Sequence, residues 1–282
     1  MLRTGKIWPS KSSAEAPIFF AKQTNSKLRI VVDYRGLNAI TIEDKYPLPL
    51  MTTLIEQVGT SQVFSKLDLK LEFNLLYIAE GGEWKRAFKT CYSLYEYAVM
   101  PFGLTNALSV FQRHLNNIVS EQIDCGVVVY IDDILIYTPT KEVHVELVHC
   151  VLKKLSENGL CVNIDKYIFY IPEVEFVRFQ IGTQGVQMSQ KKVEDILNWP
   201  APRSVKEVQK FIGFANFYRQ FIQGFSKLTL PIQTLTHNGI MWNWIQQCQE
   251  AFKELKHRFM TTPMLCHYHT EWHKQIEQIP QI

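Results

Sequence analysis

Short apolar runs separated by turn residues dominate the first half of the chain. Residues 127–129 (Val-Val-Val) and 134–137 (Ile-Leu-Ile-Tyr) are continuous and largely β-branched, so they predict two buried strands joined as a hairpin. Residues 63–69 predict another short strand, whose side chains alternate between two faces. Further strands are expected at 77–78 and 84–90, on either side of a Gly-Gly pair, and at 94–100.

The rest of the chain shows mainly helical periodicity. Asn106 could cap a helix with apolar residues at 107, 111, 115 and 118, and a longer helix would end at residues 158–159. Short strands then alternate with turns to about residue 181, and the helical pattern resumes at Ser189. Residues 204–207 form a capping box. The remaining elements are a short helix over 51–58, an inward face at 208, 211, 212, 215 and 221, and a last stripe at 248, 252, 255 and 259.

The composition is ordinary for a globular protein of one large or two modest domains, with 282 residues, 46% hydrophobic and 20% charged. The net charge of +3 does not by itself indicate nucleic-acid binding. Residues 1–46, however, hold eight Lys and Arg against four acids, which suits a polyanionic partner as well as an ordinary Lys-rich surface. Because the six cysteines form no C-x-x-C pair and neither a signal peptide nor a membrane-length apolar run is found, we expect free thiols and an intracellular location, in the cytoplasm or nucleus.

The tip of the predicted hairpin carries two adjacent carboxylates, Asp132 and Asp133. Tight hairpins usually have Asn-Gly or Asp-Gly there, because the central residues need positive φ. Two carboxylates this close repel each other, and a divalent cation would remove the conflict; a solvated acidic turn is the alternative. If the strand that contains Asp68 lies beside this hairpin, three carboxylates converge, as needed to hold two Mg²⁺ ions for phosphoryl or nucleotidyl transfer. Spacing along the chain leaves that adjacency open.

A series of motifs in matching order and spacing covers nearly the whole chain. The motifs are Leu-Asp-Leu at 67–69, Phe73, Glu-Trp-Lys-Arg-Ala-Phe-Lys-Thr at 83–90, Met-Pro-Phe-Gly-Leu-Thr-Asn-Ala at 100–107, Tyr-Ile-Asp-Asp at 130–133, Val-Glu-Phe at 174–176, Asn-Trp-Pro at 198–200, Ser-Val-Lys-Glu-Val at 204–208 and Gly-Phe-Ala-Asn-Phe-Tyr at 213–218. In these motifs the chain resembles the reverse transcriptase, within the Pol polyprotein, of long-terminal-repeat retrotransposons of the gypsy type.

The resemblance implies an α+β right-hand polymerase fold, with fingers and palm built on antiparallel sheet and a helical thumb. Residues 1–182 would form the fingers and palm, truncated at the N-terminus. Residues 183–240 would form the thumb, and residues 241–282 would begin a connection toward an absent ribonuclease H domain. The implied activity is RNA-directed DNA polymerase, with an RNA or DNA template, a primer and deoxynucleoside triphosphates as partners and no membrane; the oligomeric state stays open.

The resemblance also implies roles for the acidic residues. Asp68 and Asp132 would bind two Mg²⁺ ions, the Leu69 carbonyl would complete the second site, and Asp133 would support them. Carboxylate and carbonyl oxygens are ligands that Mg²⁺ prefers. Lys166 lies where relatives have a lysine thought to protonate the leaving pyrophosphate.

Nucleotide-binding residues follow from the same resemblance. Lys22 and Arg29 would hold the triphosphate, the ammonium as a point charge and the guanidinium by bidentate hydrogen bonds. Phe73 would lie under the deoxyribose and exclude a 2′-hydroxyl. Phe102 and Gly103 form the turn that passes near template and nucleotide, where Gly allows close backbone approach. Solvated lysines and arginines and ordinary core packing of Phe73 are the alternatives.

Several positions depart from the family pattern. Glu72 could repel a triphosphate, and Arg178 would obstruct a primer if the Gly that relatives have there approaches it closely. The other departures are Leu71, Ser93, Leu108 and Val177. These changes favour a second hypothesis, a catalytically inactive nucleic-acid-binding remnant of a degenerate retrotransposon, and the fold alone would also permit a structural or interaction protein.

The last residues add one open candidate. No ribonuclease H active site follows Leu265. A Zn²⁺ ion could bind Cys266, His267, His269 and His273, but their spacing fits no standard zinc pattern, and a frayed tail is the alternative.

Overall fold

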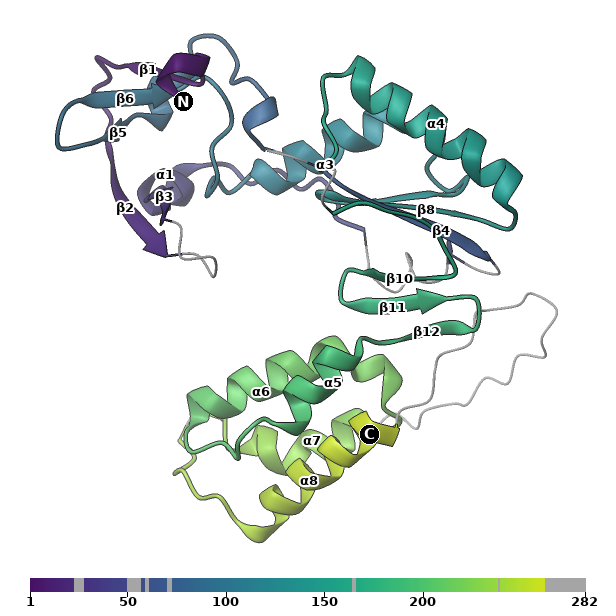
Figure 1. The fold of residues 1–282 in the computed structure, drawn as a ribbon. Coiled ribbons are helices and arrows are strands. Elements are labelled where there is room, and N and C mark those ends of the chain that lie inside the picture. Colours follow the sequence, from purple (N-terminus) through teal and green to yellow (C-terminus); the bar gives the residue numbers. More distant parts are fainter. Residues whose placement is uncertain are drawn as a thin grey trace. The chain divides into compact units, whose positions relative to one another are not determined.

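The computed structural model describes residues 1–22, 28–49, 57–58, 61–69, 73–163, 166–237 and 239–261, without the side chains of Arg29 and Phe73. The chain divides into two compact units, drawn in Figure 1. The first comprises Met1–Leu54 and Val63–Ile171, and the second Ile55–Gln62 and Pro172–Ile282. The predicted helix at 51–58 lies mostly outside the described residues.

The first unit contains a five-stranded sheet with the order β1-β6-β5-β2-β3. Its strands are β1 (Ile7–Pro9), β2 (Ala16–Lys22), β3 (Leu28–Val32), β5 (Phe88–Lys89) and β6 (Leu94–Tyr97). The short helix α1 (Arg35–Ile40) follows β3 along the chain. Only β2 and β5 pair in parallel. A small core that includes the buried rings of Tyr34, Phe88 and Tyr97 holds this sheet to the chain around it.

The prediction of a strand at 84–90 is wrong for its first half. Glu83–Arg86 is a 3₁₀ helix, and only Phe88–Lys89 is strand. The cause is local hydrogen bonding: the Lys85 N–H donates to the Gly82 carbonyl, and the Arg86 guanidinium donates to the same oxygen at 2.7 Å. A turn closed from both the main chain and a side chain competes with extended backbone.

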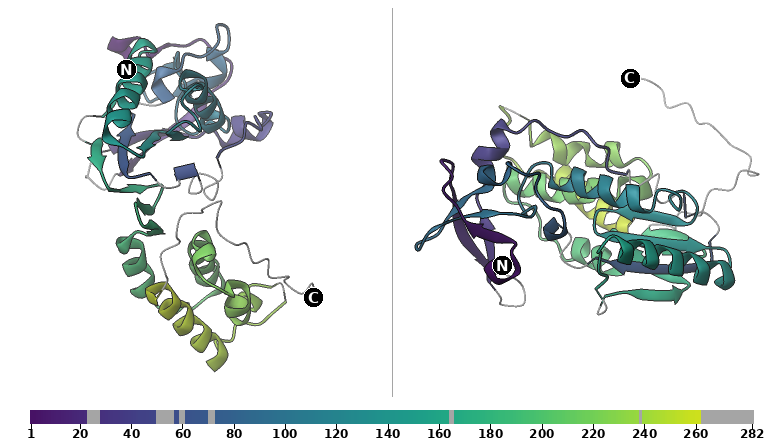
Figure 2. Two further views of the ribbon diagram at one scale, coloured as in Figure 1. Left: turned by 90° about the vertical axis from the view of Figure 1, so that its right-hand side faces the viewer. Right: turned by 90° about the horizontal axis from the view of Figure 1, so that it is seen from above.

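The second sheet of this unit is antiparallel, with the order β7-β8-β4-β9. Its strands are β4 (Val63–Asp68), β7 (Val127–Tyr130), β8 (Asp133–Thr138) and β9 (Ile168–Ile171). The helices α3 (Ala107–Ile118) and α4 (Lys141–Glu157) pack against it, and α4 lies alongside the sheet (Figures 1 and 2). The hairpin, the strand at 63–69 and both helices are confirmed as predicted.

Helix α3 differs from its prediction in two side chains. Asn106 occupies the N-cap position but makes no capping hydrogen bond; its amide bonds the Ile42 carbonyl and the Asp44 N–H instead. The predicted apolar stripe is buried at Ala107, Phe111 and Leu115, and a polar residue, Gln112, is buried with it.

The second unit joins a small antiparallel sheet to a group of helices (Figure 1). The strands are β10 (Glu173–Phe176), β11 (Phe179–Gly182) and β12 (Gly185–Met188), and the helices are α5 (Gln190–Leu197), α6 (Val205–Phe217), α7 (Phe225–Thr234) and α8 (Gln246–Thr261). The stripe predicted on α8 is buried as expected. The strands β10–β12 belong to the same compact unit as these helices. The predicted division into fingers and palm at 1–182, thumb at 183–240 and connection at 241–282 stays a prediction.

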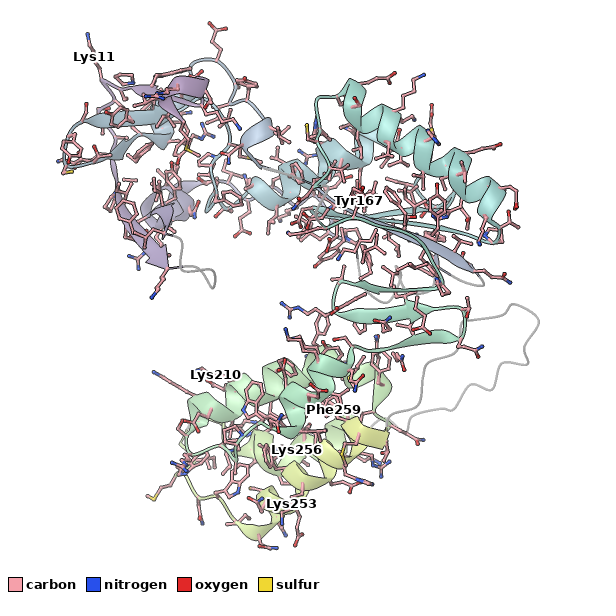
Figure 3. All side chains as sticks on the ribbon, in the orientation of Figure 1. Lys11, Tyr167, Lys210, Lys253, Lys256 and Phe259 are labelled. Atoms are coloured by element: carbon pink, nitrogen blue, oxygen red, sulfur yellow. The ribbon has the colours of Figure 1, made fainter. Side chains whose placement is uncertain are left out.

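Polar contacts fix two helix ends in this unit, the start of α6 and the end of α5. Ser204 accepts a hydrogen bond from the Glu207 N–H, as a capping box requires, but the Glu207 carboxylate accepts from the Arg203 N–H and not from Ser204. The Lys256 ammonium on α8 donates to the carbonyls of Leu197 and Trp199, at the end of α5 (Figure 3). In the part of the chain that is described, no helix has the length and apolarity to cross a membrane.

Candidate active site

The register of the four-stranded sheet places Asp68 directly opposite Asp133, across β4 and β8. Side chains of directly paired residues leave the same face of the sheet, with Cβ atoms about 5 Å apart. Asp132 belongs to the two-residue turn between β7 and β8, where Tyr130 pairs with Asp133. The predicted adjacency of the early aspartate and the hairpin tip is therefore confirmed.

The turn that carries Asp132 is held from two sides. Ile131 has φ of 55°, the left-handed conformation that such a turn normally assigns to Gly or Asn. Its N–H donates to Gln112 Oε1 at 2.7 Å, and the Asp132 carbonyl accepts from the Leu69 N–H at 3.2 Å. A β-branched residue in this region costs about 1–3 kcal/mol, so the surroundings must enforce the turn.

A lysine ammonium binds each of the two paired carboxylates. Lys66 Nζ lies 3.0 Å from Asp133 Oδ1, and Lys166 Nζ lies 3.1 Å from Asp68 Oδ2. The side-chain amide of Asn163 also donates to Asp68, at 3.4 Å. The structure therefore brings Lys166 to the acidic group, as predicted, and adds Lys66 and Asn163, which the sequence analysis missed. Lys66 precedes Asp68 by two residues, so strand alternation already put both side chains on one face.

The pKa of Asp133 is raised above its ordinary value. Burial is the largest cause; the charges of Asp132 and Asp68 act in the same direction, and Lys66 opposes them. A carboxyl group in this state gains from any additional cation nearby. The electrostatics therefore favour positive charge at this end of the sheet.

The donor chemistry of the site fits a hard divalent cation. Carboxylates from Asp68, Asp132 and Asp133 and the main chain of Leu69 come from adjacent segments, and oxygen atoms are what Mg²⁺ binds. Among the described residues, however, no three His, Cys, Asp or Glu side chains are arranged so that they could hold one ion. Lys66 and Lys166 neutralise the carboxylates in this arrangement, so metal binding would require those ammonium groups to move.

The predicted nucleotide-binding residues that the structure locates lie on the β2–β3 hairpin and in the turn at residues 102–103. Lys22 is exposed at the end of β2 opposite Leu28, and Arg29 on β3 pairs with Ala21, so both belong to one hairpin. The side chains of Arg29 and Phe73 lie outside the description. Gly103 has φ of 94°, and its neighbour Phe102 is partly exposed.

Asn38 holds the loop at Gly103 in place. Its amide donates to the Gly103 carbonyl at 2.8 Å and accepts from the Thr105 N–H at 2.9 Å. Sequence reasoning gave no signal for Asn38, since the contact joins segments far apart in the chain. The positive φ of Gly103 explains why a glycine occupies this turn.

The turn between β10 and β11 explains one departure from the family pattern. Val177 and Arg178 have φ of 44° and 71°, so both occupy the left-handed region without a glycine. The Arg178 guanidinium lies 5.7 Å from the centre of the Phe217 ring. Leu108 is partly exposed on α3, and Ser93 closes a turn with Thr90 through its carbonyl. Leu71, Glu72 and the candidate zinc ligands Cys266, His267, His269 and His273 lie outside the described residues.

The fold combines an antiparallel sheet, paired aspartates at a hairpin tip and a helical second unit. This combination is typical of nucleic-acid polymerases. The family model described as "Reverse transcriptase (RNA-dependent DNA polymerase)" matches residues 20–214. The chain belongs to the reverse transcriptase family. Members of this family generally use divalent metal ions. The α+β polymerase fold predicted above is confirmed.

Curated relatives agree with this assignment. The chain is 35% identical over 267 residues to the transposon Tf2-3 polyprotein of Schizosaccharomyces pombe, and 34% identical over the same length to the Tf2-7 polyprotein. The match covers 95% of this chain and 20% of each relative, so the chain spans about a fifth of their length. The predicted resemblance to a retrotransposon Pol fragment is confirmed.

Solved structures show the same fold. The foamy viral protease-reverse transcriptase in complex with double-stranded DNA is similar with a TM-score of 0.89 and 25% identity, over 96% of this chain and 48% of that one. The same viral protein in complex with an RNA/DNA hybrid has a TM-score of 0.84 and 25% identity, over 94% of this chain and 36% of that one.

Proposed function

We propose that this chain is the core of an RNA-directed DNA polymerase that adds deoxynucleotides to a primer 3′-hydroxyl. The observation that carries the proposal is the pairing of Asp68 with Asp133, next to Asp132, in a chain of the reverse transcriptase family. Its partners would be an RNA or DNA template, a primer and deoxynucleoside triphosphates, in the cytoplasm or nucleus. Relatives in complex with DNA and with an RNA/DNA hybrid support a nucleic-acid substrate.

The acidic residues would act through two Mg²⁺ ions. Asp68 and Asp132, with the Leu69 carbonyl, would hold the ions, and Asp133 would add negative charge beside them. When bound, Mg²⁺ lowers the pKa of the primer hydroxyl and neutralises charge on the leaving pyrophosphate. Lys66 would keep Asp133 ionised by opposing the effect of burial. Lys166, whose side chain is 62% exposed and whose Nζ lies 3.1 Å from Asp68 Oδ2, would give the leaving group a proton.

The remaining predicted residues would bind the nucleotide. Lys22 and Arg29, on the β2–β3 hairpin, would contact the triphosphate. Phe73 would exclude a 2′-hydroxyl, and Phe102 and Gly103 would contact template and nucleotide. We assign the fingers and palm to residues 1–182, the thumb to residues 183–240 and the start of a connection to residues 241–282.

A second candidate function is a catalytically inactive nucleic-acid-binding remnant. The turn at Val177 and Arg178 favours it, because a bulky charged residue stands where the family has glycine. Primer extension on poly(rA)–oligo(dT) distinguishes the two, with Asp132→Asn as the test variant and Glu80→Gln, at an exposed site away from the aspartates, as the matched control.

The polymerase proposal expects incorporation by the wild type and by Glu80→Gln, and none by Asp132→Asn. If the wild type incorporates no nucleotide but still binds primer–template, and if that binding weakens as salt rises, only the hypothesis of an inactive nucleic-acid-binding remnant remains. The salt dependence identifies phosphate contacts. Extension that survives Asp132→Asn would refute the metal role of Asp132.

A further inference from the structure

Gln112 is a fully buried polar residue on the apolar face of α3. Its amide nitrogen donates to the Val129 carbonyl at 3.1 Å and to Asn116 Oδ1 at 2.9 Å, and its oxygen accepts from the Ile131 N–H at 2.7 Å. The Val129 and Ile131 bonds go to the strand and turn that precede Asp132. Burying an amide side chain is costly unless it is hydrogen-bonded. Packing alone would be served equally well by an apolar side chain, so the hydrogen bonds are what distinguish a glutamine at this position.

The aspartate turn, residues 130–133, needs such support. Ile131 adopts a conformation that L-residues with branched side chains avoid, and no glycine relieves it. The Gln112 oxygen holds the N–H of Ile131 on one side, and the Leu69 N–H holds the carbonyl of Asp132 on the other. The peptide between them is therefore fixed at both ends, and it carries the Asp132 side chain.

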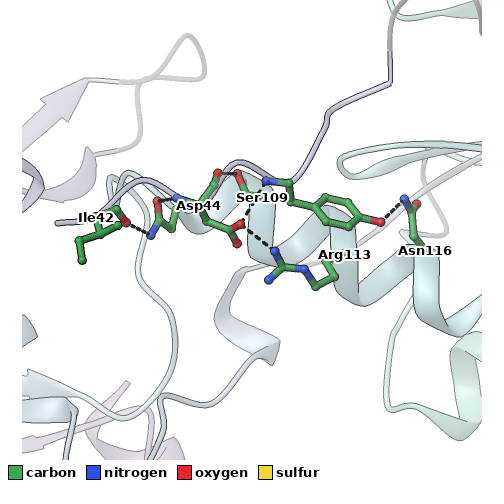
Figure 4. Close-up of polar contacts among 7 residues, drawn as sticks. Ile42, Asp44, Ser109, Arg113 and Asn116 are labelled. Carbon is green, nitrogen blue, oxygen red and sulfur yellow. Dashed lines mark hydrogen bonds and ion pairs between the residues drawn. The ribbon is translucent and has the colours of Figure 1, made fainter.

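The hydrogen bonds continue from Gln112 to the segment before the sheet. Asn116, which accepts from Gln112, donates to the Tyr46 hydroxyl at 2.8 Å (Figure 4). Tyr46 donates through its main chain to Asp44 Oδ1, and Arg113 Nη2 lies 2.7 Å from the same oxygen. The Arg113 guanidinium also stacks over the Tyr46 ring, at 4.8 Å from its centre. The orientation of the Gln112 amide is set by its main-chain partners, since the Val129 carbonyl can only accept and the Ile131 N–H can only donate.

We propose that Gln112 is a positioning residue for the candidate metal site: it holds the aspartate turn in the conformation that places Asp132 next to Asp133, at the end of the sheet where Asp68 lies. The inference rests on the proposed function but concerns the geometry of the metal ligands. Supporting partners of this kind typically change metal affinity or activity by about 10–100-fold when removed.

The test compares Gln112→Met with a matched core variant in the full chain. Methionine keeps the size and flexibility of glutamine and removes all its hydrogen bonds. Val151→Ala on α4 removes buried apolar volume in the same core but no hydrogen bond to the turn, and should lower the melting temperature without affecting the aspartates. For each protein we would measure Mn²⁺ binding by electron paramagnetic resonance, hydrogen exchange of the peptide 127–137, and kcat and KM for the nucleotide.

The proposal expects Gln112→Met to bind Mn²⁺ about tenfold more weakly, to exchange faster in peptide 127–137, and to lose kcat more than it raises KM. Val151→Ala should show none of these changes. Wild-type Mn²⁺ affinity and unchanged exchange in Gln112→Met would overturn the proposal, as would equal changes in Val151→Ala.

If Gln112→Met does not fold, the double variant Gln112→Met/Ile131→Gly is measured instead, since glycine adopts a positive φ without strain. Recovery of folding and of protection in peptide 127–137 is then expected, and no recovery would overturn the assignment. A wild type that binds Mn²⁺ but extends no primer defeats the proposed function only; the metal-binding and exchange data still decide the role of Gln112.

Discussion

Lys66 Nζ lies 3.0 Å from Asp133 Oδ1, on the same strand face as Asp68. Both side chains are largely shielded, with exposed fractions of 20% for Lys66 and 24% for Asp133. The ion pair therefore forms where burial and two neighbouring carboxylates raise the pKa of Asp133. Keeping Asp133 ionised beside two other carboxylates in a half-buried place lowers the stability of the folded protein, and a bound cation would remove this destabilisation.

Asp132→Asn should stabilise the protein while it removes activity. It eliminates one of the charges that raise the pKa of Asp133 and leaves the Lys66 pair intact, so we expect a gain of about 0.5–1 kcal/mol at pH 7. Thermal unfolding without metal measures this gain. Glu80→Gln is the control, and a lower melting temperature for Asp132→Asn would contradict the electrostatic account.

The pH dependence of stability provides a second check on Asp133. Its folded-state pKa is higher than the ordinary value of 3.8, so the native state holds more protons than the unfolded chain in this range. This group therefore contributes stability that falls as pH rises from about 3.8 through the folded pKa. The fall should be shallower in Asp132→Asn, as measured by denaturant unfolding across this range.

His144 should make the four-stranded sheet β7-β8-β4-β9 sensitive to acid. It is fully buried on α4; Ser65 Oγ lies 2.7 Å from Nε2 and Thr138 Oγ1 lies 2.8 Å from Nδ1. Thr138 donates its own proton to the Thr140 carbonyl, so Nδ1 carries the hydrogen and Nε2 accepts from Ser65. A second ring proton, on Nε2, would force the Ser65 hydroxyl to turn its own hydrogen away, and burial lowers the pKa of His144 below its ordinary value of 6.5.

Because the folded pKa is depressed, the stability contributed by neutral His144 is full above pH 6.5 and is lost as pH falls below it. Melting temperatures from pH 7.5 to pH 5 should fall in the wild type. His144→Gln should flatten that slope, whereas His149→Gln, at an exposed position on the same helix, should not. Equal slopes in all three proteins would exclude His144 as the cause.

Arg178→Gly should stabilise the second unit. An arginine at φ of 71° costs about 1–2 kcal/mol that glycine avoids, and the lost contact with Phe217 offsets about half of this gain. Urea unfolding should show a net gain of about 0.5–1 kcal/mol. Gln187→Gly on β12, an exposed strand position, is the control and should destabilise. If Arg178 obstructs a primer, the same substitution also tightens primer–template binding.

Lys166→Gln tests the role proposed for this lysine. Removing a general acid should lower kcat by roughly 10²-fold with a small change in KM, because the proton transfer matters in the transition state. Single-nucleotide incorporation gives both constants. Lys153→Gln, at an exposed site on α4, should leave them unchanged. If kcat is unchanged in Lys166→Gln, Lys166 is not the general acid, and its role is only to neutralise the charge of Asp68.

Local sequence determined the two strands of the hairpin with their acidic tip, the strand β4 and the helices α3, α4 and α8, but it gave no prediction of β1, β2 and β3. Val127–Tyr130 and Asp133–Thr138 are recognisable because apolar β-branched runs have few other stable arrangements. The helix α8 followed from its apolar spacing for a similar reason. Local pattern failed at Glu83–Arg86, where a side chain closes a turn that propensity does not reveal.

Tertiary structure alone decided which of these elements meet. Asp68 and Asp133 are neighbours because β4 pairs with β8, and strand pairing over such a separation depends on the whole core, not on the residues paired. Resemblance to relatives suggested that pairing, but spacing could not. Gln112 reads as an interruption in an apolar stripe until the fold places Ile131 beside it. Sequence thus set the chemical groups and their local conformations, and long-range packing set their distances.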